Sequence, residues 1–202
     1  MNFWDQNYSA VDGYKYGEAP NAFLREEAAR LDSPSRILVP GDGEGRNGVW
    51  LAEQGHFVQS IDSSAVGLAR ARDLAQRRGV AIDTVQADLA SWQPEPASAD
   101  AVVMIYLHLP PALRPAVHAK LVQALKPGGL LLLEAFHPKQ LGYSSGGPKD
   151  EAMLYTLDML RADLADGMEE VMAEEGPATL DEGPGHQGPA WVTRWIGRKI
   201  AA

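Results

Sequence analysis

Three closely spaced glycines and one acid form the pattern in this sequence that most clearly indicates chemistry. Gly41, Gly43 and Gly45 follow a short apolar run, and a second apolar run, 57–61, ends at Asp62. Because glycine has no Cβ, a turn built from it can bend sharply and approach a ligand closely. A carboxylate at the end of the second strand is placed to accept hydrogen bonds from sugar hydroxyls. We therefore expect a strand–helix–strand unit that binds a nucleoside-containing ligand.

Two kinds of ligand fit this unit. With Gly48, the last two glycines of the loop give the G-x-G-x-x-G spacing of nicotinamide-dinucleotide sites, which carry an acid about 20 residues further on. The three glycines alone fit the loop with which methyltransferases bind S-adenosylmethionine. Asp42 and Glu44 lie inside the loop, where carboxylates oppose a pyrophosphate but suit a ligand with a sulfonium and an ammonium group. The acidic loop therefore favours the methyl donor.

Length and composition limit the possible functions. The chain has 202 residues, a formal net charge of −9 and no cysteine. This length suits one domain better than a nicotinamide domain joined to a substrate domain. The acidic charge argues against nucleic acid as a partner, and the lack of cysteine excludes disulfides, thiolate catalysis and cysteine-bound zinc. The apolar stretches are too short for a membrane span and no leader is visible, so we expect a soluble cytoplasmic protein. The oligomeric state stays open.

Apolar periodicity and turn residues divide the chain into alternating strands and helices. Helices are predicted over 19–32, 46–55, 64–79, 110–125 and 156–165, and strands over 37–39, 57–61, 80–86, 101–107, 130–135, 168–181 and 190–199. This order predicts an α/β fold: a doubly wound, mostly parallel, seven-stranded sheet that ends in an antiparallel hairpin. We expect a single domain over 1–202, divided into an N-terminal lid and helix (1–33), a cofactor-binding core (34–136) and a substrate-side loop, helix and hairpin (137–202).

Four separated segments carry a resemblance to a known family. They are YKYGEAPNAFL near the start, the GEGRN loop, KPGG before the fifth strand, and EGPGHQGPA in the hairpin. The chain resembles the class I S-adenosylmethionine-dependent methyltransferases over essentially its whole length. Within that superfamily it is similar to the small single-domain proteins related to tellurite-resistance and thiopurine methyltransferases. The resemblance implies a Rossmann-like methyltransferase fold, S-adenosylmethionine as cofactor and a small molecule as substrate.

The resemblance also implies which residues hold the cofactor. The loop glycines would contact its methionine half, with Tyr106 beneath, while one acid accepts from the ribose hydroxyls and another from the adenine amine. The implied set is Gly41, Asp42, Gly43, Gly45, Asp62, Ser63, Asp88, Leu89 and Tyr106. Many relatives have an acid two residues before the first loop glycine, where this chain has Val39. Asp42 or Glu44 could replace that acid as the anchor of the cofactor's amino group.

The histidines divide by their place along the predicted sheet, because ligands bind beyond the carboxyl ends of parallel strands. His56 and His118 lie elsewhere, so we expect structural or solvated roles for them. His108, His137 and His186 follow the fourth strand, the fifth strand and the first strand of the hairpin, at the ligand end. We expect His186 and His137 to be the catalytic candidates, as bases or substrate clamps, and His108 to support them. The alternative is that the rings of these three histidines only cap the ends of strands. No further ligand is marked by its spacing, so no metal site is expected.

Other polar and aromatic residues near the predicted ligand end suggest contacts to a substrate. Arg46 opens the helix after the glycine loop, where a cation is unfavourable, so it should pair with Asp42 or Glu44 or else bind an anionic substrate. Aromatic residues crowd the N-terminal segment and form either a small core or a lid that excludes water: Trp4, Tyr8, Tyr14 and Tyr16. Tyr143, in the loop after the fifth strand, could close the other side.

The function expected from these features is methyl transfer to a small molecule. A thiol or another chalcogen acceptor is the first choice, because such nucleophiles need little deprotonation near neutral pH. An oxygen or nitrogen acceptor, which needs a positioned base, is the second. A nicotinamide-dependent oxidoreductase and a catalytically silent cofactor-binding protein are the alternatives from other classes.

Overall fold

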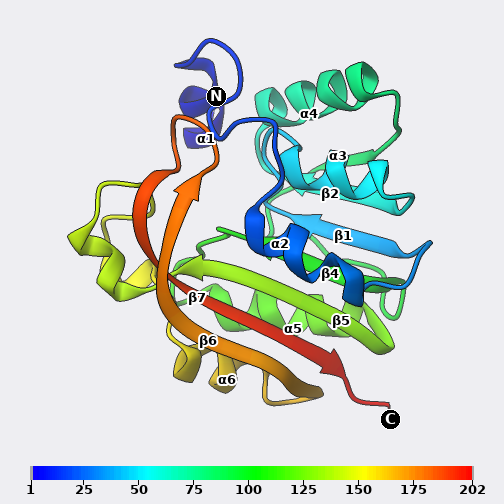
Figure 1. The fold of residues 1–202 in the computed structure, drawn as a ribbon. Coiled ribbons are helices and arrows are strands. Elements are labelled where there is room, and N and C mark those ends of the chain that lie inside the picture. Colours follow the sequence, from blue (N-terminus) through cyan, green and yellow to red (C-terminus); the bar gives the residue numbers. More distant parts are fainter. Residues whose placement is uncertain (1, 202) are drawn as a thin grey trace.

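A computed structural model describes residues 2–201 and shows a seven-stranded sheet covered by helices (Figure 1). The strands are β1 Arg36–Pro40, β2 Phe57–Asp62, β3 Asp83–Gln86, β4 Ala99–Ile105, β5 Leu125–Phe136, β6 Met168–Asp181 and β7 Gln187–Lys199. Their order across the sheet is β3-β2-β1-β4-β5-β7-β6. All neighbouring pairs are parallel except β5 with β7 and β6 with β7. The predicted fold class, with its C-terminal antiparallel hairpin, is confirmed.

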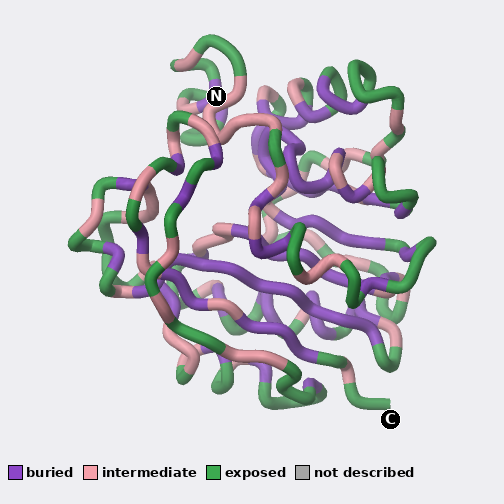
Figure 2. The backbone as a smooth tube through the Cα atoms, viewed as in Figure 1, coloured by how far each residue is buried: buried purple, intermediate pink, exposed green. Residues whose placement is uncertain are grey.

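Helices cover both faces of this sheet. They are α1 Phe3–Ser9, α2 Ala22–Glu27, α3 Arg46–Glu53, α4 Ala65–Arg78, α5 Arg114–Ala124 and α6 Leu157–Leu164, with short 3-10 helices at Ala28–Arg30, Pro138–Gly142 and Glu151–Met153. One apolar core joins α5 and α6 to the sheet, and a second joins α2 and α3 to its other face. The central strands β1, β4 and β5 are buried along most of their length (Figure 2).

The predicted helix over 64–79 shows how local sequence sets these boundaries. Ser64 caps α4, because its Oγ accepts a hydrogen bond from the backbone N–H of Gly67 at 3.0 Å. Gly79 ends the helix in the left-handed conformation with φ +69°. Leu68, Leu74 and their neighbours form the buried face. The helix therefore begins and ends within one residue of the prediction.

Some boundaries differ from the prediction. β5 begins at Leu125, because KPGG lies within the strand as an irregularity between the pairs Ala99–Leu125 and Ala101–Leu130. β3 begins at Asp83, α5 only at Arg114 and β7 already at Gln187. The helix α1 was not predicted. It is stabilised by a capping box in which the side chains of Asn2 and Asp5 each accept a backbone N–H from the other residue.

The long hairpin of β6 and β7 bends away from the plane of the sheet toward α1 (Figure 1). Its turn, 182–186, meets the N-terminal segment, since the N–H of Gly185 donates to the carbonyl of Lys15 at 2.9 Å. Gly183 and Gly185 allow this approach, because a Cβ on either would lie within 2.6 Å of Tyr16 or Gly17. The turn and the N-terminal segment together enclose the carboxyl end of the sheet.

Candidate active site

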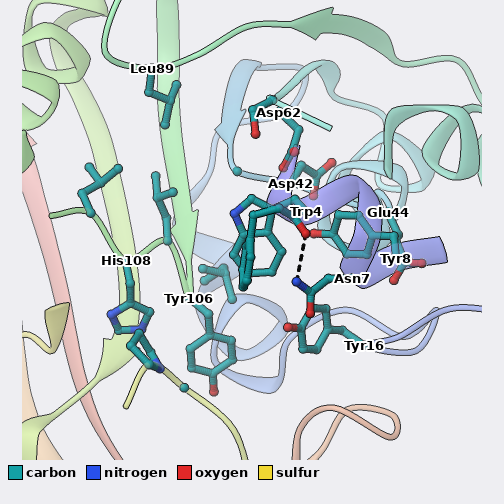
Figure 3. Close-up of a pocket in the computed structure, with 18 of the residues that line it drawn as sticks. Trp4, Asn7, Tyr8, Tyr16, Asp42, Glu44, Asp62, Leu89, Tyr106 and His108 are labelled. Carbon is teal, nitrogen blue, oxygen red and sulfur yellow. Dashed lines mark hydrogen bonds between the residues drawn. The ribbon is translucent and has the colours of Figure 1, made fainter. Parts of the chain in front are cut away.

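A cavity of about 640 Å³ lies at the carboxyl ends of β1, β2 and β4 (Figure 3). Its walls come from residues 3–17, the β1–α3 loop, the segments after β2, β3, β4 and β5, and the hairpin turn. This volume is in the range of sites that enclose small ligands. The position is the one expected for a ligand in an open parallel sheet.

The glycine loop borders this cavity with one glycine and packs inward with the other two. Gly41, Gly43 and Gly45 all have positive φ, of 70°, 58° and 86°. Gly41 lines the cavity. A Cβ on Gly43 would lie 2.3 Å from the Tyr8 hydroxyl, and one on Gly45 would lie 2.6 Å from the Cβ of Ala71. Close packing against α1 and α4, as well as approach to a ligand, therefore requires these glycines.

Asp62, at the end of β2, presents a buried carboxylate to the cavity. Its Oδ1 accepts from the N–H of Ser64 at 2.8 Å and its Oδ2 from the N–H of Gly43 at 2.9 Å. Burial raises the pKa of this carboxyl, and the bonds from Ser64 and Gly43 oppose that rise. Each carboxylate oxygen has a further lone pair. The carboxylate is thus fixed in place with capacity for two more hydrogen bonds.

The two acids inside the loop also reach the cavity, and protein groups hold both of them. Asp42 accepts from the Ser60 hydroxyl at 2.5 Å and from the N–H of Gly48 at 3.2 Å, and burial raises its pKa to about 6. Glu44 accepts from the N–H of Lys15 and from the guanidinium of Arg70. Figure 3 shows these two carboxylates and Asp62 on one side of the cavity. Such a wall attracts positively charged groups and repels phosphate.

Asp88 and Leu89, after β3, lie at the far end of the same wall, next to Ser63. Asp88 is exposed, and its Oδ1 accepts from the N–H of Ala90 at 2.9 Å.

The unpredicted helix α1 covers this end of the cavity with Phe3, Trp4, Asn7 and Tyr8, and the Trp4 and Tyr8 rings stack with centroids 5.8 Å apart. Trp4 and Tyr8 therefore line the cavity. Tyr14 instead bonds to α4 through the carbonyl of Arg70.

The opposite end of the cavity is aromatic. Tyr106, directly after β4, has a φ of +52°, which is rare for a residue other than glycine and signals backbone strain at this point. Its ring stacks on Phe136 at 4.5 Å, and its hydroxyl is buried without a hydrogen-bond partner. The His186 ring lies 4.6 Å from the Tyr106 ring and 4.4 Å from the Tyr16 ring. Four rings thus surround one end of the cavity.

At the aromatic end of the cavity, the ring nitrogens of His186 accept and donate no hydrogen bond within residues 2–201, so the ring remains available to a ligand. It is buried, and burial lowers its pKa, so the ring is neutral near neutral pH. His108 also lines the cavity, but its Nδ1 bonds to the carbonyl of Met153 at 2.7 Å and its Nε2 accepts from the N–H of Phe136 at 3.2 Å. Burial lowers the pKa of His108 to about 4. His108 therefore forms part of the cavity wall, with both ring nitrogens bonded to the backbone.

His137 and Tyr143 are not among the residues that line the cavity. Phe136 faces the cavity, and successive side chains of an extended segment point to opposite sides, so His137 points away. Its Nδ1 accepts from the N–H of Lys139 at 3.0 Å, which caps the following 3-10 helix, and its Nε2 lies 3.5 Å from Glu175. Tyr143 follows that helix and is half-buried. We therefore restrict the candidate for proton transfer to His186.

Arg46 lines the cavity but does not pair with Asp42 or Glu44 as expected. Its Nη2 donates instead to Glu182 of the hairpin turn at 2.7 Å, and both side chains are nearly buried, with 7% and 6% exposed. The loop acids are already held by other groups, so this more distant carboxylate balances the cation. Its Nη1 is buried without a hydrogen-bond partner. Sequence reasoning missed Glu182, because only the folded hairpin brings it to Arg46.

This arrangement fits S-adenosylmethionine. The acidic wall suits its sulfonium and ammonium groups, the free lone pairs of Asp62 suit its ribose hydroxyls, and the apolar end beyond Tyr106 leaves room for an acceptor. Within residues 2–201, no group of three or more histidine or acidic side chains is placed to hold a metal ion. In the same part of the chain, every helix is too short or too polar to cross a membrane.

Comparisons with known proteins agree with this site. Residues 37–129 match the family model of a methyltransferase domain. Thiocyanate methyltransferase 1 of Arabidopsis thaliana is 26% identical over 164 residues, which are 79% of this chain and 68% of that protein. The tRNA 5-carboxymethoxyuridine methyltransferase of Escherichia coli is 33% identical over 134 residues, which are 61% of this chain and 50% of that protein. This chain thus spans half the length of the tRNA enzyme.

A solved structure extends the likeness to the whole fold. TehB from Haemophilus influenzae superposes with a TM-score of 0.68 at 22% identity, and the match covers 86% of this chain and 60% of TehB. The family and the cofactor expected from the sequence are confirmed, and the nicotinamide alternative finds no support. The methyltransferase-domain match over 37–129, the strand order and the cavity together support an S-adenosylmethionine-dependent methyltransferase.

Proposed function

We propose that this methyltransferase acts on a thiol or another chalcogen group of a small molecule. The observation that carries the proposal is the environment of His186, a buried histidine with a lowered pKa at the aromatic end of the cavity. A ring of low pKa is a weak base. It can take the proton of a thiol, whose pKa is about 8–9, far more readily than that of an alcohol. The aromatic rings around it suit a polarizable sulfur.

In this proposal the cofactor lies along the acidic wall. Gly41, the loop acids and Tyr106 hold its methionine half, Asp62 and Ser63 its ribose, and Asp88 and Leu89 its adenine. Gly43 and Gly45 lie behind these residues and maintain the conformation of the loop. When bound, the cofactor supplies an electrophilic methyl group on a sulfonium. The protein contributes alignment of the acceptor and exclusion of water, which together can be worth about 7–11 kcal/mol.

The acceptor enters the aromatic end, between the N-terminal segment and the hairpin turn. Tyr16 and Phe136 hold it by ring contacts, and Arg46 favours an acceptor that develops negative charge on sulfur. The three parts of the chain, 1–33, 34–136 and 137–202, then act as lid, cofactor core and acceptor side of a single domain. A cavity of about 640 Å³ that must also hold the cofactor leaves space for a small acceptor only.

The names of two relatives bear on the choice of acceptor. Thiocyanate methyltransferase 1 is named for a small sulfur-containing anion, which supports a soft acceptor. The Escherichia coli relative is named for a tRNA nucleoside, which favours an acceptor on a large substrate. The net charge of −9 opposes tRNA binding, so we place a small chalcogen acceptor first. An oxygen or nitrogen group of a small metabolite is second.

The proposal is tested with a panel of small acceptors and one measured quantity, the release of S-adenosylhomocysteine. The panel contains alkyl and aromatic thiols, hydrosulfide, selenide, thiocyanate, phenols, amines and carboxylates, with tRNA that carries 5-carboxymethoxyuridine as a further arm. We expect kcat/KM for the best chalcogen acceptor to exceed that for the best oxygen or nitrogen acceptor by at least about tenfold. A phenol, an amine or tRNA as the best acceptor would contradict the proposal.

A further inference from the structure

Glu182, in the turn between β6 and β7, lies at the centre of a buried polar cluster beside the aromatic end of the cavity. Its Oε1 accepts from the side-chain amide of Asn21 at 2.8 Å and from the N–H of Ala22 at 3.2 Å. Its Oε2 accepts from Arg46 at 2.7 Å. The amide of Asn21 also donates to buried Glu134 at 2.7 Å. Contacts from the start of α2 and from α3 thus fix this carboxylate, and Glu134 of β5 in turn holds Asn21.

The carboxylate of Glu182 is charged throughout the working range of the protein. Burial alone would raise its pKa, but the neighbouring His186 and the charge and hydrogen bond of Arg46 outweigh burial and lower the pKa to about 2. The turn itself is tight, since the N–H of Glu182 donates to the carbonyl of His186 at 3.0 Å and the N–H of His186 donates to Gly183 at 3.1 Å. Charge and backbone together keep this carboxylate next to the histidine.

One edge of the His186 ring faces this carboxylate, and the other edge faces the cavity wall. Nδ1 is buried without a hydrogen-bond partner, and the nearest carboxylate oxygen, Oε2 of Glu182, lies 3.8 Å away. The edge with Cδ2 and Nε2 packs on Gly146, next to Gly147 and Pro148 of the cavity lining. A Cβ on Gly146 would lie 2.6 Å from Cδ2, so only glycine leaves room for the ring.

We propose that Glu182 is a positioning residue, which keeps the proton of neutral His186 on Nδ1 and so leaves Nε2 free to accept the proton of the acceptor thiol. This inference rests on the function proposed above. A histidine has one donor and one acceptor nitrogen when neutral, and a carboxylate beside one nitrogen selects which it is. The carboxylate also stabilises the positive charge that the ring gains when it takes the proton.

The proposed step couples proton transfer from the acceptor thiol to methyl transfer from the cofactor. The acceptor S–H bond breaks and its proton passes to Nε2 of His186, while the acceptor sulfur forms a bond to the methyl carbon. The bond between that carbon and the sulfonium breaks, and its electron pair stays on the sulfur of S-adenosylhomocysteine. His186 then returns its proton to solvent. No oxidant or reductant is needed.

Other charged or titratable groups also face this histidine. Glu182 raises its pKa, while burial first and then Arg46 and Lys15 lower it. The titratable rings beside it are those of Tyr16, Tyr106 and His108. Because Glu182 partly balances the charge of Arg46, the pKa of His186 is lowered less than burial and the nearby cations alone would lower it. Removal of the carboxylate should therefore lower the pKa of His186 further.

The first test uses no acceptor. In the protein with ¹⁵N-labelled histidine, long-range ¹H–¹⁵N correlation spectra at neutral pH report which ring nitrogen carries the proton. We expect His186 to be protonated on Nδ1 in the native chain and to lose this preference in Glu182→Gln. A native His186 protonated on Nε2 would overturn the inference, and this result requires no variant to fold.

The second test compares two acceptors in the native chain and in Glu182→Gln. With an alkyl thiol, which is mostly protonated at neutral pH, kcat should fall by roughly 10–10²-fold. With an aromatic thiol that is already ionised, the fall should stay within about threefold, because no base is needed. The acid limb of the pH–rate profile should move to lower pH in the variant. S-adenosylhomocysteine affinity should stay within a few-fold.

Glu175→Gln is the matched control, since Glu175 lies 3.5 Å from His137 outside the cavity. It should change neither acceptor's rate. Equal losses with both thiols in Glu182→Gln would show a merely structural role and overturn the inference, as would full activity with the alkyl thiol. If the native chain binds the cofactor but methylates neither thiol, the proposed acceptor class is wrong, and the spectra alone decide the role of Glu182.

Discussion

Replacement of Asp62 by alanine tests the placement of the cofactor along the acidic wall. In the structure each carboxylate oxygen already accepts one backbone N–H, from Ser64 or Gly43, at 2.8–2.9 Å. The remaining lone pairs are available to the two ribose hydroxyls. Alanine removes both of these charge-assisted bonds and leaves the β1–α3 loop without one of its anchors.

The expected loss follows from these contacts. A hydrogen bond to a charged group contributes about 1.5–3 kcal/mol, so two of them contribute about 3–6 kcal/mol. Water that enters the space left by the carboxylate recovers part of this free energy. We therefore expect a weakening of cofactor binding by roughly 10²-fold, and by no less than about tenfold, which corresponds to 1.4 kcal/mol.

The assay is a calorimetric titration with S-adenosylhomocysteine on the native chain, on Asp62→Ala and on Asp73→Ala. Asp73 lies on α4 with 61% of its side chain exposed, and its replacement should leave the dissociation constant unchanged. Thermal melts of each variant without ligand show how much of the fold is retained. An unchanged dissociation constant in a folded Asp62→Ala protein would refute the placement of the ribose at this carboxylate.

Three further predictions concern the base, the loop and the buried acid. His186→Ala should leave S-adenosylhomocysteine affinity within a few-fold but lower transfer to an alkyl thiol by roughly 10²-fold, and unchanged turnover would exclude a role as base. Gly45→Ala should lower the free energy of unfolding by roughly 1–3 kcal/mol, because alanine must adopt a φ of +86° with its Cβ 2.6 Å from that of Ala71. Denaturant unfolding measures this loss, and a variant as stable as the native chain would contradict the geometry. Asp42 has a folded pKa of about 6 against an ordinary value of 3.8, so the folded state binds more protons between these values. The free energy of unfolding should then fall by up to about 3 kcal/mol as pH rises from about 4 to 6, and Asp42→Asn should remove this slope if Asp42 causes it.

Features that depend on nearby residues could be predicted from the sequence. The caps of α4 at Ser64 and Gly79 are separated only by the helix itself, so local chemistry sets both ends. The strand order follows from the alternation of apolar runs and helices together with the family resemblance. The capping box at Asn2 and Asp5 was visible in principle, but a helix of seven residues gives too short a periodic pattern to identify.

Contacts between distant residues could not be predicted in this way. Arg46 and Glu182 are 136 positions apart, and their pairing depends on the bend of the hairpin. The rule that ligands bind at the carboxyl ends of strands placed His137 near the site but could not give the direction of its side chain, which points away because Phe136 points in. Position along the chain fixes which end of the sheet a residue occupies, and the pleat and the loops fix what it faces.

The most direct test of the central claim follows the methyl group itself. The native chain is incubated with S-adenosylmethionine labelled with ¹³C in the methyl group and with the best small thiol of the panel, and both products are measured by mass spectrometry. We predict a labelled thioether and S-adenosylhomocysteine in equal amounts, both lost when S-adenosylmethionine is omitted. Tight binding of the cofactor with no labelled thioether, together with label on an oxygen or nitrogen acceptor or on tRNA, would contradict the account.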